Sequence, residues 1–356
     1  MRVLFYDALT SFAYDAELMA QRGIGGTEST VVRIAEGLST AHEVVVAQRA
    51  RILPVSPHPG LRYVPLEEPD PFCGPPPDWV IVLRKHKLVP KLRARFPLAA
   101  MVSWIHNWQR AETAFQRIGL ARSRCSVVTV SDAHCRATDR LINGKGARAL
   151  GALWGGGGIV PVKRIYNPVD DRLMPDGTPV DPDKLIFFST ANKGLNQALT
   201  TFSAIRKVLP SLQLYVAGES LESLEQNKRY DSALLSQPGV HLLGRLAQHE
   251  VFKHVREALC VFYPQNVHPE TFGLVFAESN ALGTPVLAHE FGSAREILGG
   301  PEQLVDAGDV RSISAKLQRW RNGNRPLVSL SAEFRTTTVV GKWREFLVAG
   351  LPEQRN

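Results

Sequence analysis

The chain has 356 residues, of which 44% are hydrophobic and 21% charged; this composition is that of a folded globular protein and excludes disordered, collagen-like and coiled-coil chains. The length indicates two domains rather than one. No apolar run approaches the roughly 18–20 residues that a membrane-spanning helix needs, and no signal-peptide pattern follows Met1, so we expect a cytoplasmic protein. The four cysteines form no C-x-x-C pair and are expected to be reduced thiols.

The net charge of +8 comes entirely from the first half of the chain. Residues 1–172 contain 23 Lys and Arg against 15 Asp and Glu, whereas residues 173–356 contain 19 of each. Between Asp78 and Glu112 there is no acidic residue, but there are seven basic ones: Arg84, Lys85, Lys87, Lys91, Arg93, Arg95 and Arg110. This run is either an ordinary solvated face or, in the stretch 84–95, a surface for an anionic membrane or an anionic acceptor. No nucleic-acid-binding motif accompanies the charge, so no nucleic acid partner is expected.

The predicted elements alternate between short β-branched strands and longer helical patterns. In the first half, strands are expected at 2–7, 43–48, 61–65, 79–83, 99–104, 126–130 and 162–166, with helices near 28–39, 109–119 and 132–143. In the second half, strands are expected at 185–189, 212–217, 259–263 and 284–288, with a helix over 194–209. This alternation predicts an α/β protein with two Rossmann-like, doubly wound domains on parallel sheets. The Pro-, Asp- and Gly-rich residues 170–183 are interpreted as the linker.

The most informative motif is the segment 268–283, which directly follows a predicted strand. A helix that begins near Gly273 presents free N–H groups and the positive end of its dipole, which suits a phosphate. Glu270 precedes this helix and Glu278 lies inside it, so one carboxylate can lie on each side of a bound diphosphate. The backbone amides that would hold the diphosphate are those of Gly273, Leu274 and Val275. A nucleotide sugar has this layout, because hydroxyl groups flank its diphosphate on both sides. Ligands of doubly wound domains bind outside the carboxyl ends of strands, so the cleft between the domains is the expected site.

These residues carry a resemblance to a known family. Glu270-x7-Glu278, followed by Ala281-x-Gly283-x-Pro285-Val286 and residues 292–296, resembles the signature of the family 4 retaining glycosyltransferases (glycosyl transferases group 1) of GT-B fold. Other motifs match in the family's order: Gly25-Gly26-Thr27-Glu28, Ile105-His106-Asn107, Val130-Ser131, Asn167-Pro168-Val169-Asp170 and Lys193-Gly194. The resemblance therefore spans about the whole chain.

The resemblance implies three catalytic residues. Glu270 would meet the donor sugar near its anomeric centre, His106 would touch that sugar from the opposite domain, and Lys193 would neutralise the diphosphate. The implied donor-binding residues are Glu278 on the ribose, with Phe272, Gly273, Leu274, Val275, Gly25, Gly26 and Thr27. Many members have an Arg about five residues before the Lys, but residues 187–192 contain none, and Arg245 is a candidate to replace it. The family transfers with retention and uses neither metal nor cofactor, so Asp181-Pro182-Asp183 is interpreted as linker and not as a metal motif.

The same resemblance implies the domain organisation and the function. Residues 1–172 would form an acceptor-side domain against which a C-terminal helix at about 336–356 packs, and residues 173–335 would bind the nucleotide-sugar donor. The expected activity is transfer of a hexosyl group to a glycan, lipid-linked or other acceptor in cell-envelope or polysaccharide biosynthesis. The protein is then expected in the cytoplasm, with the inner face of the membrane as a peripheral location.

Two alternatives keep this fold and drop the transfer: a nucleotide-sugar epimerase, in which Glu270 or His106 serves as base, and a non-catalytic protein that binds nucleotide or glycan. Each residue also has an ordinary structural interpretation. Glu270 and Glu278 can be capping or surface glutamates, His106 a hydrogen-bonded core histidine, and Lys193 a surface lysine. The sequence leaves open the donor base, the sugar and the acceptor.

Overall fold

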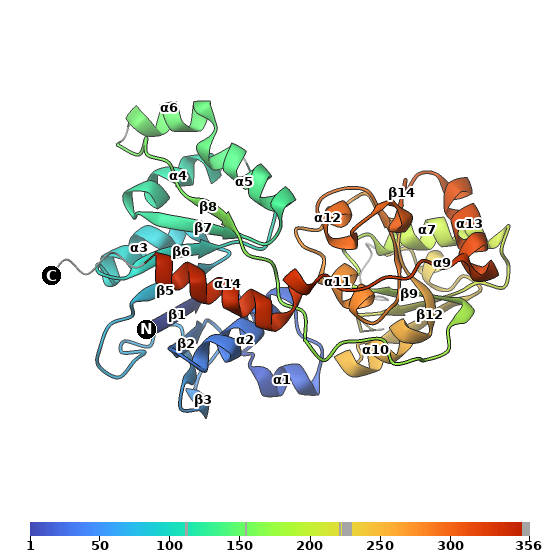
Figure 1. The fold of residues 1–356 in the computed structure, drawn as a ribbon, viewed down its shortest axis with the longest axis horizontal. Helices are drawn as coiled ribbons and strands as arrows, with labels where there is room; N and C mark the ends of the chain where they lie inside the picture. Colours follow the sequence, from blue (N-terminus) through green and yellow to red (C-terminus); the bar gives the residue numbers. More distant parts are fainter. Residues whose placement is uncertain (111–112, 154, 221, 223–229, 351–356) are drawn as a thin grey trace. The chain divides into compact units, whose positions relative to one another are not determined.

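The computed structural model describes residues 1–110, 113–153, 155–220, 222 and 230–350 (Figure 1). The chain divides into two compact units. The first comprises Met1–Glu17, Gly25–Pro168 and the chain from Glu333 on, and the second comprises Leu18–Ile24 and Val169–Ala332. The main boundary therefore follows Pro168, not residue 172, and a short N-terminal segment joins the second unit, which the sequence did not suggest.

The first unit is built on an eight-stranded sheet with the strand order β3-β4-β2-β1-β5-β6-β7-β8. The strands are β1 (Arg2–Asp7), β2 (Glu43–Gln48), β3 (Val55–His58), β4 (Leu61–Pro65), β5 (Trp79–Leu83), β6 (Ala100–Trp104), β7 (Cys125–Thr129) and β8 (Val162–Arg164). All neighbours pair in parallel except β3 and β4, which are antiparallel. The chain runs outward from β1 to β2 and β4 and then returns to β5 on the other side of β1, so the strand order reverses at β1.

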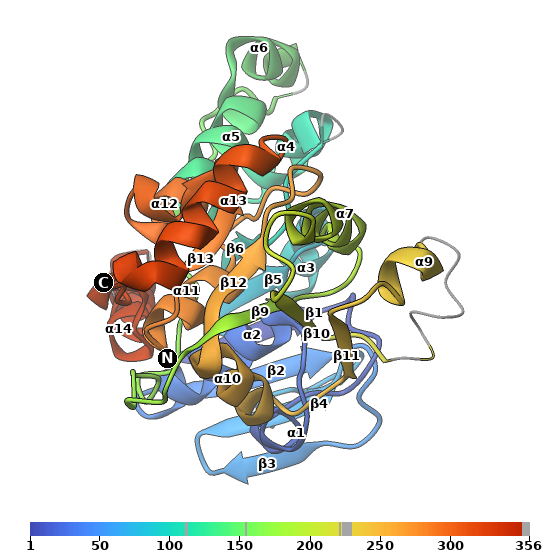
Figure 2. The ribbon, with the colours of Figure 1, turned by 90° about the vertical axis from the view of Figure 1, so that its right-hand side faces the viewer.

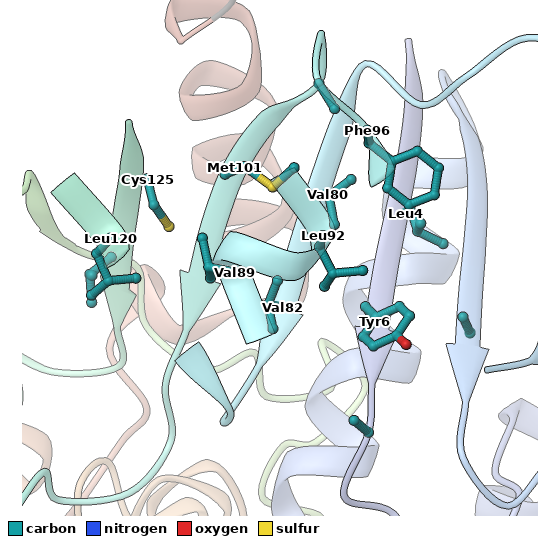
Figure 3. Packing of buried hydrophobic residues seen from close by; sticks show 14 of the residues in the cluster. Leu4, Tyr6, Val80, Val82, Val89, Leu92, Phe96, Met101, Leu120 and Cys125 are labelled. Carbon is teal, nitrogen blue, oxygen red and sulfur yellow. The ribbon is translucent and has the colours of Figure 1, made fainter. Parts of the chain in front are cut away.

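Helices cover this sheet and bury its apolar strands. They are α2 (Gly26–Ser39), η1 (His86–Leu88), α3 (Val89–Arg95), α4 (Thr113–Arg122), α5 (Asp132–Asn143), α6 (Lys145–Leu153) and α14 (Thr336–Ala349). The short helix α1 (Ala16–Gln21) crosses the unit boundary and has no buried residue. Figure 3 shows one cluster of the core, in which Val89 and Leu92 of α3 pack on Val80 and Val82 of β5 and on Met101 of β6. Strands covered on both faces become nearly continuous apolar runs, which is why β1 and β5 were easy to predict.

The C-terminal helix α14 packs on α2 within the first unit. Arg344 donates a hydrogen bond of 2.8 Å to the carbonyl of Gly37, and a side chain at position 37 would overlap Val340. The ring of Trp343 lies edge-on against that of Trp104, with the ring centroids 4.8 Å apart. The glycine therefore allows the two helices to approach closely. Residues 351–356 of the predicted helix lie outside the described residues.

The second unit has a parallel sheet with the strand order β11-β10-β9-β12-β13-β14. The strands are β9 (Asp181–Phe188), β10 (Gln213–Ala217), β11 (Val240–Gly244), β12 (Ala258–Tyr263), β13 (Val286–His289) and β14 (Leu304–Val305). The helices are α7 (Leu195–Arg206), α9 (Ser232–Leu235), α10 (Gln248–Glu257), α11 (Leu274–Ala281), α12 (Ala294–Leu298) and α13 (Val310–Arg319), with short turns η2 (Pro301–Gln303), η3 (Trp320–Asn324) and η4 (Ala332–Phe334), the last at the unit boundary. Figure 2 shows α7 and α13 side by side on one face of the sheet and α10 on the other.

The predicted fold class is confirmed, but some element predictions are wrong. The expected linker ends too late, because β9 already begins at Asp181, where it pairs with Ala258 of β12; Pro182 is tolerated at this exposed start of the strand. The helix expected at 109–119 is α4, which begins at Thr113, and residues 111–112 lie outside the described chain. The missed strands β3, β11 and β14 are short or lie at sheet edges. Within the described ranges, no helix combines the length and apolarity needed to cross a bilayer.

Candidate functional site

The centre of the candidate site in the second unit is an ion pair between Lys193 and Glu270. Lys193 follows β9 and Glu270 follows β12, and these strands are neighbours in the sheet. The Lys193 ammonium donates hydrogen bonds of 2.9 and 2.8 Å to the two carboxylate oxygens, and the Tyr263 hydroxyl donates a third of 2.8 Å to Oε1. The Glu270 side chain is only 7% exposed, whereas that of Lys193 is 42% exposed. The cation therefore faces solvent and the carboxylate is held beneath it.

Tyr263 is fixed as a hydrogen-bond donor to this carboxylate. Burial, and secondly the charge of Glu270, raise its pKa well above that of a free tyrosine. The phenol therefore stays protonated at every physiological pH. Its ring stacks on Phe187 of β9 at 5.4 Å, which holds the hydroxyl in place.

The backbone around Glu270 is fixed from two sides. On one side, Ser293 at the start of α12 donates to the Glu270 carbonyl through both its N–H and its hydroxyl, each at 3.1 Å. Gly292, with φ of 60°, packs so closely on that carbonyl that a side chain there would overlap it. On the other side, the buried Gln265 side chain bonds the backbone of His268, and Gly194 leaves room for it. The ion pair is thus held by a rigid loop.

The predicted turn at Gly273 is present and begins α11. Gly273 has φ of 80°, which an L-residue rarely adopts, and a side chain there would overlap Phe276. The first backbone N–H groups of any helix have no partner within the helix and attract anions. Phe272 is buried, and Leu274 and Val275 form the first turn. These residues follow Glu270 directly, so the helix N-terminus and the ion pair belong to one connection.

Glu278 lies inside α11 and has a different partner from Glu270. It is buried, and its Oε1 accepts a hydrogen bond of 3.1 Å from Gln248, the first residue of α10. Gln248 carries no local signal in the sequence and was not predicted. Arg245, the candidate replacement for the missing arginine, follows β11 and is exposed. Among the described residues, no ion pair or hydrogen bond links Arg245 to Lys193, Glu270 or Glu278.

The first unit contains a second charged cluster, which the sequence did not reveal. Arg84 follows β5 and donates two hydrogen bonds of 3.0 Å to both oxygens of Asp7, at the end of β1. Its other amino group pairs at 3.0 Å with Glu28 of α2. Tyr14 donates a further 3.0 Å hydrogen bond to Asp7. We call these four residues the Arg84 network.

The Arg84 network explains the predicted glycine loop. Gly25 is the N-cap of α2, and Gly26 and Thr27 begin the helix. The Glu28 carboxylate turns back over Gly25 so closely that any side chain at 25 would overlap it. Arg84 therefore holds the carboxylate that requires this glycine. The loop's glycine has a structural reason in the described residues, beside the role that the resemblance implies.

His106 lies two residues beyond β6, and its ring packs on Trp104 at 4.6 Å. Both ring nitrogens are buried. Burial lowers its pKa well below that of a free histidine, and the nearby Arg84 and, secondly, a protonated His134 would disfavour its protonation further. The imidazole is therefore neutral near pH 7.

The basic stretch 84–95 is less of a free surface than the sequence suggested. Arg84 is paired inside the unit, and Arg93 donates to the carbonyls of Ser123, Pro97 and Ala99. Guanidinium groups with several planar donors suit such internal bonding better than lysines do. The exposed cations of the stretch are therefore Lys87, Lys91 and Arg95.

Comparison with known proteins finds a family match for the second unit. Residues 176–335 match the family described as glycosyl transferases group 1. A phosphatidyl-myo-inositol mannosyltransferase of Mycobacterium leprae is 27% identical over 132 residues, which are 36% of this chain and only 34% of that protein. The segment shared with this relative therefore spans about a third of its length.

Two solved structures share the fold over nearly the whole chain. One is AviGT4, a glycosyltransferase involved in avilamycin A biosynthesis. The match covers 98% of this chain and 98% of AviGT4, with a TM-score of 0.62 and 19% identity. The other is sucrose-phosphate synthase from Thermosynechococcus elongatus. The match covers 98% of this chain and 94% of that protein, with a TM-score of 0.63 and 17% identity. The chain thus has the GT-B fold, and its residues 176–335 match the glycosyl transferases group 1 family.

Proposed function

We propose that the chain is a retaining, metal-independent hexosyltransferase of family 4, which moves a hexosyl group from a nucleotide-diphosphate sugar to a glycan, lipid-linked or other acceptor in cell-envelope or polysaccharide biosynthesis. One observation carries the proposal: a solvent-facing lysine is paired with a buried glutamate beside the N-terminus of α11, inside the segment that matches the family. The name of the mycobacterial relative, a mannosyltransferase for phosphatidyl-myo-inositol, supports a lipid-linked acceptor.

In this proposal, Lys193 and the first N–H groups of α11 bind the diphosphate. Negative charge grows on the departing nucleoside diphosphate, so a cation there stabilises the transition state more than the ground state. Glu270 accepts hydrogen bonds from hydroxyls of the donor sugar, and Tyr263 keeps its carboxylate oriented. Glu278 accepts from the ribose hydroxyls. Arg245 remains a candidate for a second diphosphate contact.

Retention follows if the acceptor attacks from the face that the diphosphate leaves. The leaving phosphate oxygen then takes the proton of the acceptor hydroxyl, and no protein base is required. The neutral His106 suits a contact with an uncharged sugar, because it brings no charge near the anomeric centre.

The test is thermal stabilisation of the purified chain by a panel of nucleoside diphosphates and nucleotide sugars, with and without chelator, repeated on Glu278→Ala. We expect a rise in melting temperature with one base, retained in chelator and lost in the variant. Release of nucleoside diphosphate only when an acceptor is added distinguishes transfer from epimerisation. The anomeric configuration of the product, read by NMR, tests retention. The absence of any nucleotide-dependent shift would overturn the proposal.

A further inference from the structure

The first unit contains a cavity of about 610 Å³ at the carboxyl ends of β1, β2, β4 and β5. These four strands are neighbours, and the strand order reverses at β1, where doubly wound sheets commonly bind ligands. The volume lies within the roughly 300–1,000 Å³ of small-molecule sites. The cavity lies wholly within one unit and contains none of the residues assigned above to the donor.

Four cations line the cavity, from three separate parts of the chain. Arg49 and Arg51 follow β2, Lys85 follows β5, and Lys91 projects from α3. Glu67 is the carboxylate among the lining residues. The charge of the lining is therefore strongly positive, although these residues are distant in sequence.

Within the described residues, the fold compensates Arg51 but not the other three cations. Arg51 is buried and donates to Asp15 at 2.8 Å and to the Tyr14 carbonyl at 3.1 Å. For Arg49, Lys85 and Lys91, no side-chain hydrogen bond or ion pair occurs within the described part of the chain. Like charges around one cavity repel each other, and low-dielectric walls focus their field on the space between them. An anion placed there removes this repulsion.

The rest of the lining suits an organic anion rather than a bare ion. Leu66, Leu88 and Leu92 supply apolar surface. Tyr6 contributes a hydroxyl group to the lining. Burial, and secondly the charge of Glu67, raise the pKa of this phenol, so the hydroxyl stays neutral and can donate a hydrogen bond. A phosphate alone would leave most of the volume empty, whereas a sugar that carries a phosphate or a carboxylate would use both the cations and the apolar wall.

We propose that this cavity, lined by Arg49, Lys85 and Lys91, binds the phosphate or carboxylate group of a sugar-sized acceptor. The inference rests on the proposed function, since it names the class of acceptor, and it differs from a membrane-binding surface. A membrane surface would use every exposed lysine of the stretch, including Lys87 of η1, which does not line the cavity. Lys87 is therefore a matched control for Lys91: both are exposed lysines of one short segment.

The experiment is calorimetric titration of the full chain with glucose 6-phosphate, glucuronate, inorganic phosphate and glucose, at a saturating concentration of the nucleoside diphosphate that stabilises it. We expect the sugar phosphate or the uronate to bind and glucose not to bind. Arg49→Ala and Lys91→Ala should each weaken binding about five- to tenfold, as the loss of one charge-assisted hydrogen bond does. Lys87→Ala should leave it within about twofold.

The outcomes distinguish this inference from the proposed function. If a nucleoside diphosphate binds but none of the anionic probes does, the inference is wrong and the proposed function stands. If an anion binds to the cavity but no nucleotide does, the proposed function fails and the anion site remains. Equal losses in Lys87→Ala and Lys91→Ala, accompanied by flotation with phosphatidylglycerol vesicles that both variants reduce, would replace the cavity by a membrane surface.

Discussion

Two charged clusters at the carboxyl ends of strands differ in how much water reaches them. In the second unit, Lys193 is 42% exposed above a buried Glu270. In the first unit, Arg84 is 19% exposed, and Asp7 is completely buried beneath it. Arg84 also pairs with Glu28 on another element, whereas Lys193 has one carboxylate partner.

This difference separates two uses of an ion pair. A buried cation with several fixed partners ties elements together, and removing it leaves carboxylates buried without compensation. A half-exposed cation contributes little to stability, because water screens it, but it can turn to a ligand. We therefore expect changes at Arg84 to appear mainly as lost stability, and changes at Lys193 mainly as lost turnover.

The largest effect is expected for Arg84→Ala. It leaves Asp7 buried with only Tyr14 and backbone N–H groups as partners, and it frees Glu28 over the glycine loop. We expect a loss of about 3–5 kcal/mol of unfolding free energy. Urea unfolding followed by tryptophan fluorescence measures it, because Trp104 and Trp343 lie in the first unit.

The matched control for Arg84→Ala is Arg172→Ala. Arg172 also forms an arginine–aspartate pair, with Asp170, but its side chain is 89% exposed. Loss of this exposed pair should lower the unfolding free energy by less than about 1 kcal/mol. Similar losses for the two variants would contradict the distinction between buried and exposed pairs.

The next largest effect is expected for Lys193→Ala, and it concerns turnover. Removing a cation that stabilises the leaving diphosphate should lower kcat by about 10²–10³-fold. The melting temperature without ligand should fall much less than for Arg84→Ala, because water can reach the half-exposed position of Lys193 and Glu270 keeps its hydrogen bond from Tyr263. Initial rates of nucleoside diphosphate release provide the measurement. The control is Lys207→Ala, which changes an exposed lysine at the end of α7 and should leave kcat unchanged. If the kcat of Lys193→Ala stayed near that of the parent chain, the proposed role of Lys193 would be ruled out.

The smallest effect is a pH dependence that arises in the first unit. Burial lowers the pKa of His134 to about 4, and its Nε2 bonds the Asn107 carbonyl at 3.1 Å. In the unfolded chain His134 takes up its proton near pH 6.5, whereas in the folded chain it does so only near pH 4. The contribution of neutral, buried His134 to stability is therefore complete above pH 6.5 and is lost as the pH falls toward 4. Between pH 7 and 5.5 this one residue should lower the unfolding free energy by about 1.2 kcal/mol. His106, whose pKa is also lowered, acts in the same direction.

The measurement is urea unfolding at pH 7 and pH 5.5 for the parent chain and for His134→Gln. The variant should lose less stability between the two pH values than the parent, whatever its stability at pH 7. An unchanged pH dependence would show that His134 does not titrate as its burial requires.

The sequence by itself determined the α/β class, the central strands and the turn at Gly273. Central strands of a parallel sheet are buried on both faces, so β5, β12 and the interior of β1 are apolar and can be predicted without knowing their neighbours. The turn is equally local, because a glycine with positive φ precedes its own helix. The edge strands β3 and β11, by contrast, are only partly buried and have no such pattern.

Only the tertiary structure decided which charges meet. Lys193 and Glu270 were both expected in the site, but their direct contact depends on the adjacency of β9 and β12. Arg84 was read as one charge of a basic surface, because its partner Asp7 lies on a strand far earlier in the chain. The cavity lined by Arg49 and Lys91 likewise exists only where the ends of neighbouring strands converge. Charge pairing between distant segments leaves no periodic pattern in a sequence, whereas burial of a whole strand does.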